Sequence, residues 1–271
     1  MGFFLTQFLF LLKKKNLNCV RKILKMLSLK RYSFKTIFVV FLVLSSIKNW
    51  SQKQEKDLLT DYDHKIGTEN TPINNGALHT NPYRISNNKH RYFTDEEYTK
   101  GDVLYDSQWY YNVPLKYDLY KDVLIYKIQK ESSLGIDLIS QRVSTFRIYD
   151  KNFIFLEIPF SRNEKLKSGF FQEVYKNENF AFYAKNIRYR REIIKNQNLY
   201  TEFEDDNAYF LKNENGYYEI QSKKDLTKLY PRFKRQINEY YSSHNSIFKK
   251  NATAFYEAFA PYLFNLIKNN Q

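Results

Sequence analysis

Apolar and polar positions alternate in the middle of the chain. Every second residue from Val113 to Leu119 is apolar or aromatic, and the residues between them include Pro114, Lys116 and Asp118. A period of two places such side chains on one face of a half-buried β-strand. Because proline cannot donate to a ladder, Pro114 indicates that this strand begins at an edge or a bulge.

Short runs of the same kind recur as far as residue 220. They are V-L-I-Y-K-I (123–128), L-G-I-D-L-I (134–139), T-F-R-I-Y (145–149), N-F-I-F-L-E-I (152–158), G-F-F-Q-E-V-Y (169–175), F-A-F-Y-A-K-N-I-R-Y (180–189), A-Y-F-L (208–211) and Y-Y-E-I (217–220). Turn-forming residues fill the gaps between the runs. Spacing of about ten residues predicts a mainly β (α+β) fold over residues 92–221, an antiparallel meander forming a sandwich or a small barrel.

The period changes to that of a helix over residues 222–271. Apolar side chains recur every three or four residues over 226–240 and again over 252–266. Such a stripe is typical of a helix that packs one face against a core. We expect two to three helices, packed on the sheet as part of the same domain.

Capping residues and prolines mark the ends of these helices. Ser222 and Asp225 have the spacing of a capping box, and Pro231 suits the first turn of a new helix. Pro261 lies inside the last apolar stripe, where proline predicts a kink.

Residues 52–91 differ in composition from the β-rich region after them. They contain few large apolar side chains and many Asn, Thr, Asp and Lys residues, with Pro72, Gly76 and Pro82 as breakers. This composition predicts an extended or loosely ordered lead-in to the β-rich domain.

The stretch before residue 52 has the layout of a secretory signal. Lys30, Arg31 and Lys35 precede a twelve-residue apolar run, 36–47. A helix of that length spans about 18 Å, whereas the hydrocarbon core of a membrane is about 30 Å thick. We therefore expect a cleaved signal peptide over residues 26–51 and contact with the membrane only through it.

Cleavage is expected between Ser51 and Gln52, although Asn49 departs from the small apolar residue usual at that position and leaves the exact bond open. A signal that starts at Met26 has an ordinary length, so residues 1–25 are interpreted as an overrun of the reading frame or an extended charged region. These features predict export to the periplasm or the cell surface.

The signal also accounts for most of the net charge of +14. Residues 1–51 hold ten basic side chains and no acidic one, which leaves 33 basic and 29 acidic side chains in the remainder. A net charge of +4 on residues 52–271 gives little support to nucleic acid as a partner. Cys19 is the one cysteine, so a chain beginning at Gln52 has no thiolate and no disulfide.

The densest aromatic stretch offers a binding surface. Trp109, Tyr110 and Tyr111 are consecutive, and exposed aromatic rings stack on a sugar ring or on a peptide. The alternative is that these rings pack on the pleated surface of a strand, where aromatic side chains are common. A glycan, a peptide or another envelope component is the expected partner, and no cofactor is expected.

Catalytic and metal-binding patterns are weak. The four histidines lack the spacing of metal ligands, the Gly-x-Ser-x-Gly elbow is missing, and no glycine loop could hold a phosphate. An active site could still be assembled from distant residues such as His79, His90, Asp118 and Glu202. A pocket that brings a histidine and a carboxylate together would support this.

Three blocks carry a resemblance to a known family. They are G-D-V-L-Y-D-S-Q-W-Y-Y-N-V-P-L-K-Y-D-L-Y-K-D-V-L-I (101–125), K-L-K-S-G-F-F (165–171) and S-K-K-D-L-T-K-L-Y-P (222–231). In outline, from about residue 100 to 265, the chain resembles an uncharacterised family of exported, signal-bearing β-rich proteins of Bacteroidota. The resemblance implies export and lends neither an activity nor catalytic residues.

Two functions remain as hypotheses. The first is an exported envelope or periplasmic protein that acts as a binding or structural module. The second is a secreted hydrolase with an active site assembled from distant histidines and carboxylates. The ligand and the oligomeric state stay open at this point.

Overall fold

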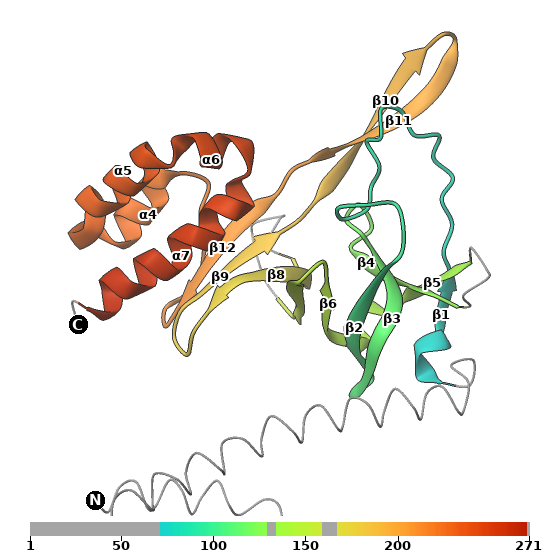
Figure 1. The fold of residues 1–271 in the computed structure, drawn as a ribbon, viewed down its shortest axis with the longest axis horizontal. Helices are drawn as coiled ribbons and strands as arrows, with labels where there is room; N and C mark the ends of the chain where they lie inside the picture. The colour runs from blue at the N-terminus through green and yellow to red at the C-terminus, as the bar shows by residue number, and fades with distance from the viewer. Residues whose placement is uncertain (1–70, 129–133, 159–166, 270–271) are drawn as a thin grey trace, which may run out of the picture. The chain divides into compact units, whose positions relative to one another are not determined.

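A computed structural model describes residues 71–128, 134–158 and 167–269 (Figure 1). All of them belong to one compact unit, residues 59–271. The predicted start at Met26, the signal peptide, the cleavage between Ser51 and Gln52, and His64 lie outside the described residues.

Thirteen strands are found in the described ranges. They are β1 (Gly76–Leu78), β2 (Thr99–Tyr105), β3 (Gln108–Asp118), β4 (Val123–Lys127), β5 (Gly135–Leu138), β6 (Val143–Ile148), β7 (Lys151–Leu156), β8 (Gly169–Lys176), β9 (Ala181–Lys185), β10 (Arg188–Lys195), β11 (Asn198–Asp205), β12 (Ala208–Asn213) and β13 (Gly216–Glu219).

Eleven of these strands form one sheet in the order β1-β5-β4-β3-β2-β6-β7-β8-β9-β12-β13, and neighbouring strands are antiparallel. The predicted mainly β meander is therefore confirmed. The sheet differs from a closed barrel in that β1 and β13 are its two free edges among the described strands. Closure depends on pairing between the first and last strands, which the local pattern does not report.

Strand β3 shows how the alternating pattern acts. Leu115 and Tyr117 are fully buried, and the ladder between β2 and β3 shifts register between Gly101 and Val103. The strand begins at Gln108 and runs through Pro114, so it does not begin at the proline as expected. Pro114 does pair with Lys100 beside the irregularity, as its missing N–H predicts.

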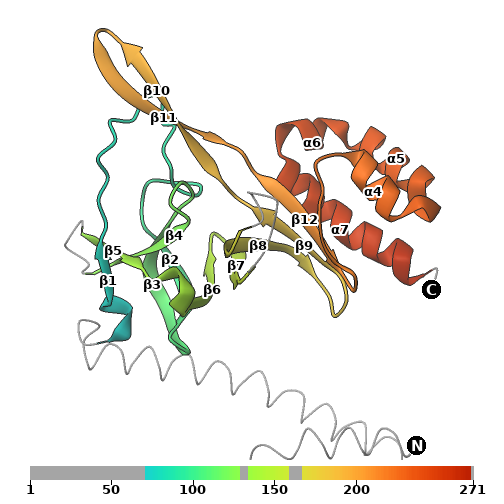
Figure 2. The ribbon, with the colours of Figure 1, turned by 180° about the vertical axis from the view of Figure 1, so that it is seen from behind.

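Strands β9 to β12 make one long hairpin. Lys185 pairs with Ala208, and Arg188 pairs with Asp205, so the two ladders keep the same register across a short break. The lower ladder belongs to the large sheet, whereas β10 and β11 form a separate two-stranded ribbon that extends away from it in both views (Figures 1 and 2). Positive φ angles at Asn196 and Gln197 close its two-residue turn.

A side chain bridges the break in this hairpin. The N–H of Ile187 donates to Asn207 Oδ1 at 3.0 Å, and the N–H of Asp206 donates to the Ile187 carbonyl at 2.9 Å. An amide side chain thus replaces one ladder bond, which leaves Asn186 and Asn207 at the edge of an opening.

Helices come after the last strand. They are α4 (Lys223–Leu229), α5 (Lys234–Ser243), α6 (Asn245–Lys250) and α7 (Ala252–Lys268). Four α-helices are therefore described after the last strand, where two to three were expected. The capping box is confirmed, since the Ser222 N–H donates to the Asp225 carboxylate at 2.8 Å, and Pro231 opens the short 3-10 turn before α5. Helix α7 continues through Pro261.

Helix α7 covers the sheet at β8 and β9, as both ribbon views show (Figures 1 and 2). The Phe182 and Tyr256 rings stack with their centroids 4.6 Å apart, and Phe259 and Leu263 are fully buried in the same core. Aromatic burial of this extent fixes the helix on the sheet.

The described part of the lead-in, residues 71–91, is built into the domain. Ile73 is fully buried in the core, β1 pairs with β5, and Ile85 bridges Thr201 of β11. Among the described residues, none of the helices has the length and apolar character needed to cross a membrane.

Candidate functional site

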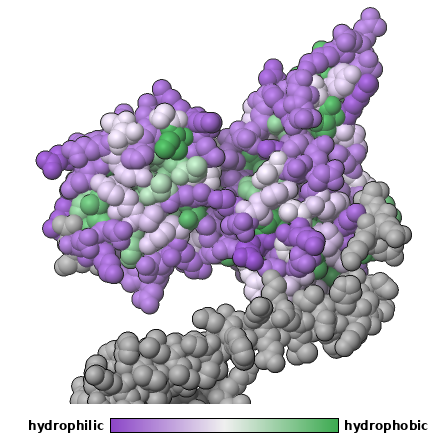
Figure 3. Space-filling view, viewed as in Figure 1, coloured by the Kyte–Doolittle hydropathy of each residue, from purple (hydrophilic) through white to green (hydrophobic). Residues whose placement is uncertain are grey.

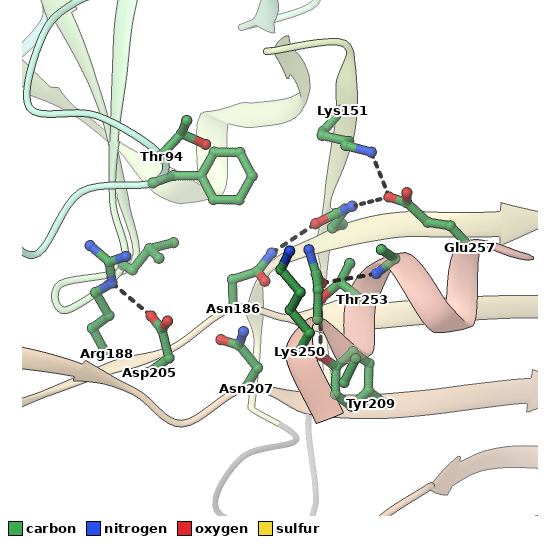
Figure 4. A pocket seen from close by; sticks show the side chains of 16 residues that line it. Thr94, Lys151, Asn186, Arg188, Asp205, Asn207, Tyr209, Lys250, Thr253 and Glu257 are labelled. Carbon is green, nitrogen blue, oxygen red and sulfur yellow. Dashed lines mark hydrogen bonds and ion pairs between the residues drawn. The ribbon is translucent and has the colours of Figure 1, made fainter. Parts of the chain in front are cut away.

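A cavity of about 610 Å³ opens where the long hairpin is interrupted and helix α7 begins (Figure 4). Its wall is drawn from β7, β8, the two arms of the hairpin break and the first turns of α7. In the close view, Lys151 and Glu257 meet on one side, Arg188 and Asp205 meet on the other, and Asn186 lies between them. The break in the hairpin therefore provides both the opening and part of its lining.

Four side chains form a hydrogen-bonded chain along one wall. Lys151 Nζ donates to Glu257 Oε1 at 2.6 Å, and Gln172 Nε2 donates to the same oxygen at 3.2 Å. Asn186 Nδ2 then donates to Gln172 Oε1 at 3.0 Å. Gln172 is 2% exposed and Asn186 is 6% exposed. Buried amides are costly unless they are hydrogen-bonded, so this chain holds each member in one orientation.

The chain leaves acceptors open towards the cavity. In the described part of the molecule, Asn186 Oδ1 has no hydrogen-bond partner, and the Glu257 contacts all go to Oε1. An amide oxygen and a carboxylate oxygen are therefore available to a ligand. The arrangement is pre-oriented, as ligand sites generally are.

The opposite wall is organised by Arg188. Its Nε donates to Asp205 Oδ1 at 2.8 Å, and its Nη1 donates to the carbonyls of His90 at 2.5 Å and Tyr92 at 2.7 Å. Arg188 thus fixes the segment that contains His90 and Tyr92 against the hairpin. Its charge is balanced locally by Asp205.

The beginning of α7 supplies further polar groups. Asn251 Oδ1 accepts from the Ala254 N–H at 3.0 Å, which caps the helix, and Lys250 directly precedes it. The Tyr209 hydroxyl lies 2.9 Å from Thr253 Oγ1. Burial raises the pKa of Tyr209, so its hydroxyl keeps its proton and can donate. The cavity wall thus holds donors and acceptors of both charges.

The predicted aromatic surface is divided between two faces of β3. Trp109 and Tyr111 stack on one half-exposed face, with centroids 5.5 Å apart and planes at 8°. Tyr110 points the other way and is fully buried in the core. The strand period of two makes consecutive residues alternate between faces, so Tyr110 has to be removed from the predicted surface.

The four residues of the hydrolase hypothesis do not form one site. His79 Nδ1 lies 2.5 Å from Asp137 Oδ1 instead, and its Nε2 faces the Tyr92 hydroxyl at 3.0 Å and Arg91 Nη2 at 3.1 Å. Since Arg91 can only donate, Nε2 is the acceptor and Nδ1–H donates to Asp137. Both ring nitrogens of His79 are thus already engaged.

Asp118 has a structural partner. It pairs with Arg91 Nε at 3.0 Å, and both side chains are buried. Its Oδ1 also accepts from the N–H groups of Tyr120 and Lys121 at 3.0 Å each. Burial raises the pKa of Asp118, opposed by the Lys121 N–H and by Arg91.

The remaining two candidates are also engaged elsewhere. Glu202 accepts from Asn87 at 2.8 Å and from Lys89 at 3.0 Å. His90 Nδ1 accepts from the Tyr92 N–H at 3.2 Å, and burial together with the charge of Arg188 lowers the pKa of His90. Within the described ranges, no group of three His, Cys, Asp or Glu side chains is placed to hold a metal ion.

Sequence reasoning missed the cavity residues. Lys151, Gln172, Asn186 and Glu257 come from separate segments of the chain, and none belongs to a recognisable motif. The available signal was Gln172, a polar residue inside the aromatic run of β8 at a position expected to be buried. No known protein family, curated protein or solved structure matches the chain.

Proposed function

We propose that the protein is an exported binding module of the cell envelope and that it binds a hydroxyl-rich ligand, a glycan, in the cavity between the hairpin break and α7. Export is supported by the signal layout over residues 26–51 and by the resemblance to exported proteins of Bacteroidota. Binding is supported by the cavity itself.

The buried pair Gln172 and Asn186 carries the proposal. Many of the fully buried side chains are aromatic, and at the cavity two buried amides are held in a chain that ends in Glu257 and Lys151. Polar groups placed at a cavity and fixed by their neighbours are what gives a binding site its specificity. A purely structural role would not require the acceptors to point into open space.

The mixture of groups favours a glycan over an anion. A sugar hydroxyl both donates and accepts, and amides such as Asn186 and Asn207 do the same. Two of the three lining cations, Lys151 and Arg188, are already paired with the carboxylates of Glu257 and Asp205, which leaves Lys250 for an anion such as phosphate. The Phe93 side chain adds an apolar patch of the kind on which a sugar ring packs.

The hydrolase alternative is supported less well. A general base needs a free nitrogen directed at the substrate, and His79 Nε2 already accepts from its neighbours Arg91 and Tyr92. His90 is likewise tied to the backbone. We therefore favour binding without turnover.

A direct test is to titrate the purified protein with envelope polysaccharide fragments and with short peptides, using calorimetry. We expect glycan binding that falls about tenfold or more in Asn186→Ala and in Glu257→Gln. Asn215→Ala, in an exposed turn, and Glu239→Gln, on the exposed side of α5, are the matched controls. Binding of peptides alone would refute the ligand class, and equal loss in the controls would refute the site.

Export is tested separately by mass spectrometry of the amino terminus of the protein from its native host. A terminus at or near Gln52 is expected. A terminus at Met1 or Met26 in the cytoplasmic fraction would overturn export and leave the binding site untouched.

A further inference from the structure

Strand β10 has an edge that no strand covers among the described residues. The other strand of the ribbon, β11, is covered, because the Thr201 N–H donates to the Arg84 carbonyl at 2.8 Å and the Phe203 N–H donates to the Lys89 carbonyl at 2.9 Å. The backbone groups of Thr201 and Phe203 therefore point away from β10.

The register shows which groups of β10 point outward. Arg190 lies opposite Phe203, and Glu192 lies opposite Thr201. In an antiparallel ladder both members of such a pair turn their backbone groups away from each other. The N–H and C=O groups of Arg190 and Glu192 thus face the free edge.

The backbone hydrogen bond of Arg188 agrees with this assignment of the outward-facing groups. Arg188 lies two residues before Arg190, and its N–H donates outward to the Leu119 carbonyl at 3.4 Å. Beyond it, no backbone partner is found in the described ranges for the N–H groups of Arg190, Glu192 or Ile194. The free edge therefore begins after Arg188 and runs to the end of the strand.

The side chains on this edge are unusually exposed. Ile194 is 77% exposed, more than any other large apolar side chain in the described ranges. Arg190 and Glu192 lie on the same face, with Arg190 Nη2 at 3.3 Å from Glu192 Oε1. In the space-filling view, apolar atoms appear among the polar ones on the projecting ribbon (Figure 3).

We infer that β10 pairs with β10 of a second copy of this chain, antiparallel and centred on Arg191. This register places Arg190 of each copy opposite Glu192 of the other, which forms two ion pairs across the new ladder. On the other face, Tyr189 of each copy lies opposite Ile193 of the other, an aromatic and β-branched pair that sheets favour.

The same register accounts for the exposure of Ile194. It brings Ile194 of one copy to the point where the free edge of the other ribbon ends, beside the Leu119–Tyr120 segment that occupies the edge at Arg188. Tyr120 is exposed and packs on Phe203, whose side chain lies on the same ribbon face as that of Ile194. Each copy thus covers an apolar side chain of the other.

Charge complementarity singles out this register. Shifting the centre by one residue places Glu192 opposite Glu192, which is unfavourable. In the proposed register Arg191 faces Arg191, but each is neutralised within its own ribbon by Glu202 opposite and by Glu204 at 3.3 Å. The contact is small, so the dimer forms reversibly.

The test is sedimentation velocity of the purified protein over a range of concentrations. We expect a reversible dimer that is weakened about tenfold by Arg190→Glu or by Glu192→Arg. The double variant R190E/E192R restores the ion pairs with reversed sign and is expected to dimerise like the original chain. Arg235→Glu on the exposed face of α5 is the control and leaves the dimer intact.

A disulfide tests the register. Residues at position 191 of the two copies form a non-hydrogen-bonded pair, whose Cα atoms lie about 4.5 Å apart, within disulfide range. In a Cys19→Ser background, Arg191→Cys is expected to give a covalent dimer on oxidation, and Arg235→Cys is not. A protein that stays monomeric at every concentration, or a double variant as weak as the single ones, overturns the proposal. A dimer without the disulfide overturns the register.

Discussion

Asn186 Nδ2 donates to Gln172 Oε1 at 3.0 Å, where Gln172 lies in β8 and Asn186 directly follows the adjacent strand β9, at the break in the long hairpin. The hydrogen bond joins the end of β9 to the middle of β8. It therefore couples the position of the break to the wall of the cavity, where Gln172 also contacts Glu257 of α7.

Replacing one member of this pair leaves the other unsatisfied. Asn186→Leu is expected to lower the free energy of unfolding by about 1–3 kcal/mol, because Gln172 Oε1 loses its donor in a buried place. The double variant Q172L/N186L removes both polar groups and is expected to recover part of that loss. Urea denaturation measures both, and a double variant as unstable as the sum of its single ones would contradict the coupling.

The buried pair of Arg91 and Asp118 gives a larger effect. Asp118→Ala leaves the Arg91 charge without its counter-ion in the interior, and we expect a loss of about 3–5 kcal/mol in the free energy of unfolding. Arg235→Ala breaks an exposed pair with Glu239 and is expected to change stability by less than about 1 kcal/mol. Denaturant titration of both variants compares them, and equal effects would contradict burial of the first pair.

The carboxylate of Asp137 makes the stability of the fold depend on pH. Burial acts to raise the pKa of Asp137, but the hydrogen bond from the His79 ring and the charge and hydrogen bond of Lys121 outweigh it and lower this pKa. A lowered pKa in the folded state gives stability that is present above the unfolded value, 3.8, and is lost as pH falls through the folded value.

Asp137→Asn keeps an acceptor for His79 and removes the charge, so it isolates this contribution. We expect the variant to be about 1 kcal/mol less stable at pH 7. The difference from the original chain should shrink below about pH 4. Urea denaturation from pH 7 to pH 3 checks this, and a constant difference would show that the charge of Asp137 is not responsible.

Trp109 and Tyr111 form the remaining part of the predicted aromatic surface. In a chain that begins at Gln52, Trp109 is the one tryptophan, so its fluorescence reports on this face alone. If a second sugar ring or an aromatic peptide side chain stacks there, the ligand should change the emission of Trp109, and Trp109→Ala should weaken binding by about 1 kcal/mol. Unchanged emission at saturating ligand would exclude this face.

Much of the fold could be predicted because its signals are local. The alternation around Leu115 and Tyr117, the capping box of Ser222 and Asp225, and the 3-10 turn that Pro231 opens before α5 all depend on residues close in sequence. Whether the sheet closes into a barrel depends on the pairing of distant strands, which the local pattern of apolar and polar residues does not predict. The buried role of Ile73 in the lead-in was missed for the same reason, since the core that buries it comes from later strands.

The candidate site was harder to predict than the fold. Lys151 and Glu257 are more than a hundred residues apart, and only the packing of α7 on β8 brings them together. His79 and Asp137 meet through the pairing of β1 with β5, so the histidine was recognised as a candidate and its carboxylate was not. Residue types can be read from a sequence, but the pairing of distant residues depends on sheet order.

The shared register of the long hairpin constrains how this chain can change in length. One extra residue in either arm of the break, at 186–187 or 206–207, would turn every side chain beyond it to the opposite face. An extra residue at 206–207 would turn Phe203 to solvent and its acidic neighbours towards Tyr83 and Tyr120. Insertions and deletions are therefore tolerated only in matched pairs, one in each arm, so relatives of this protein should keep the two segments equal in length.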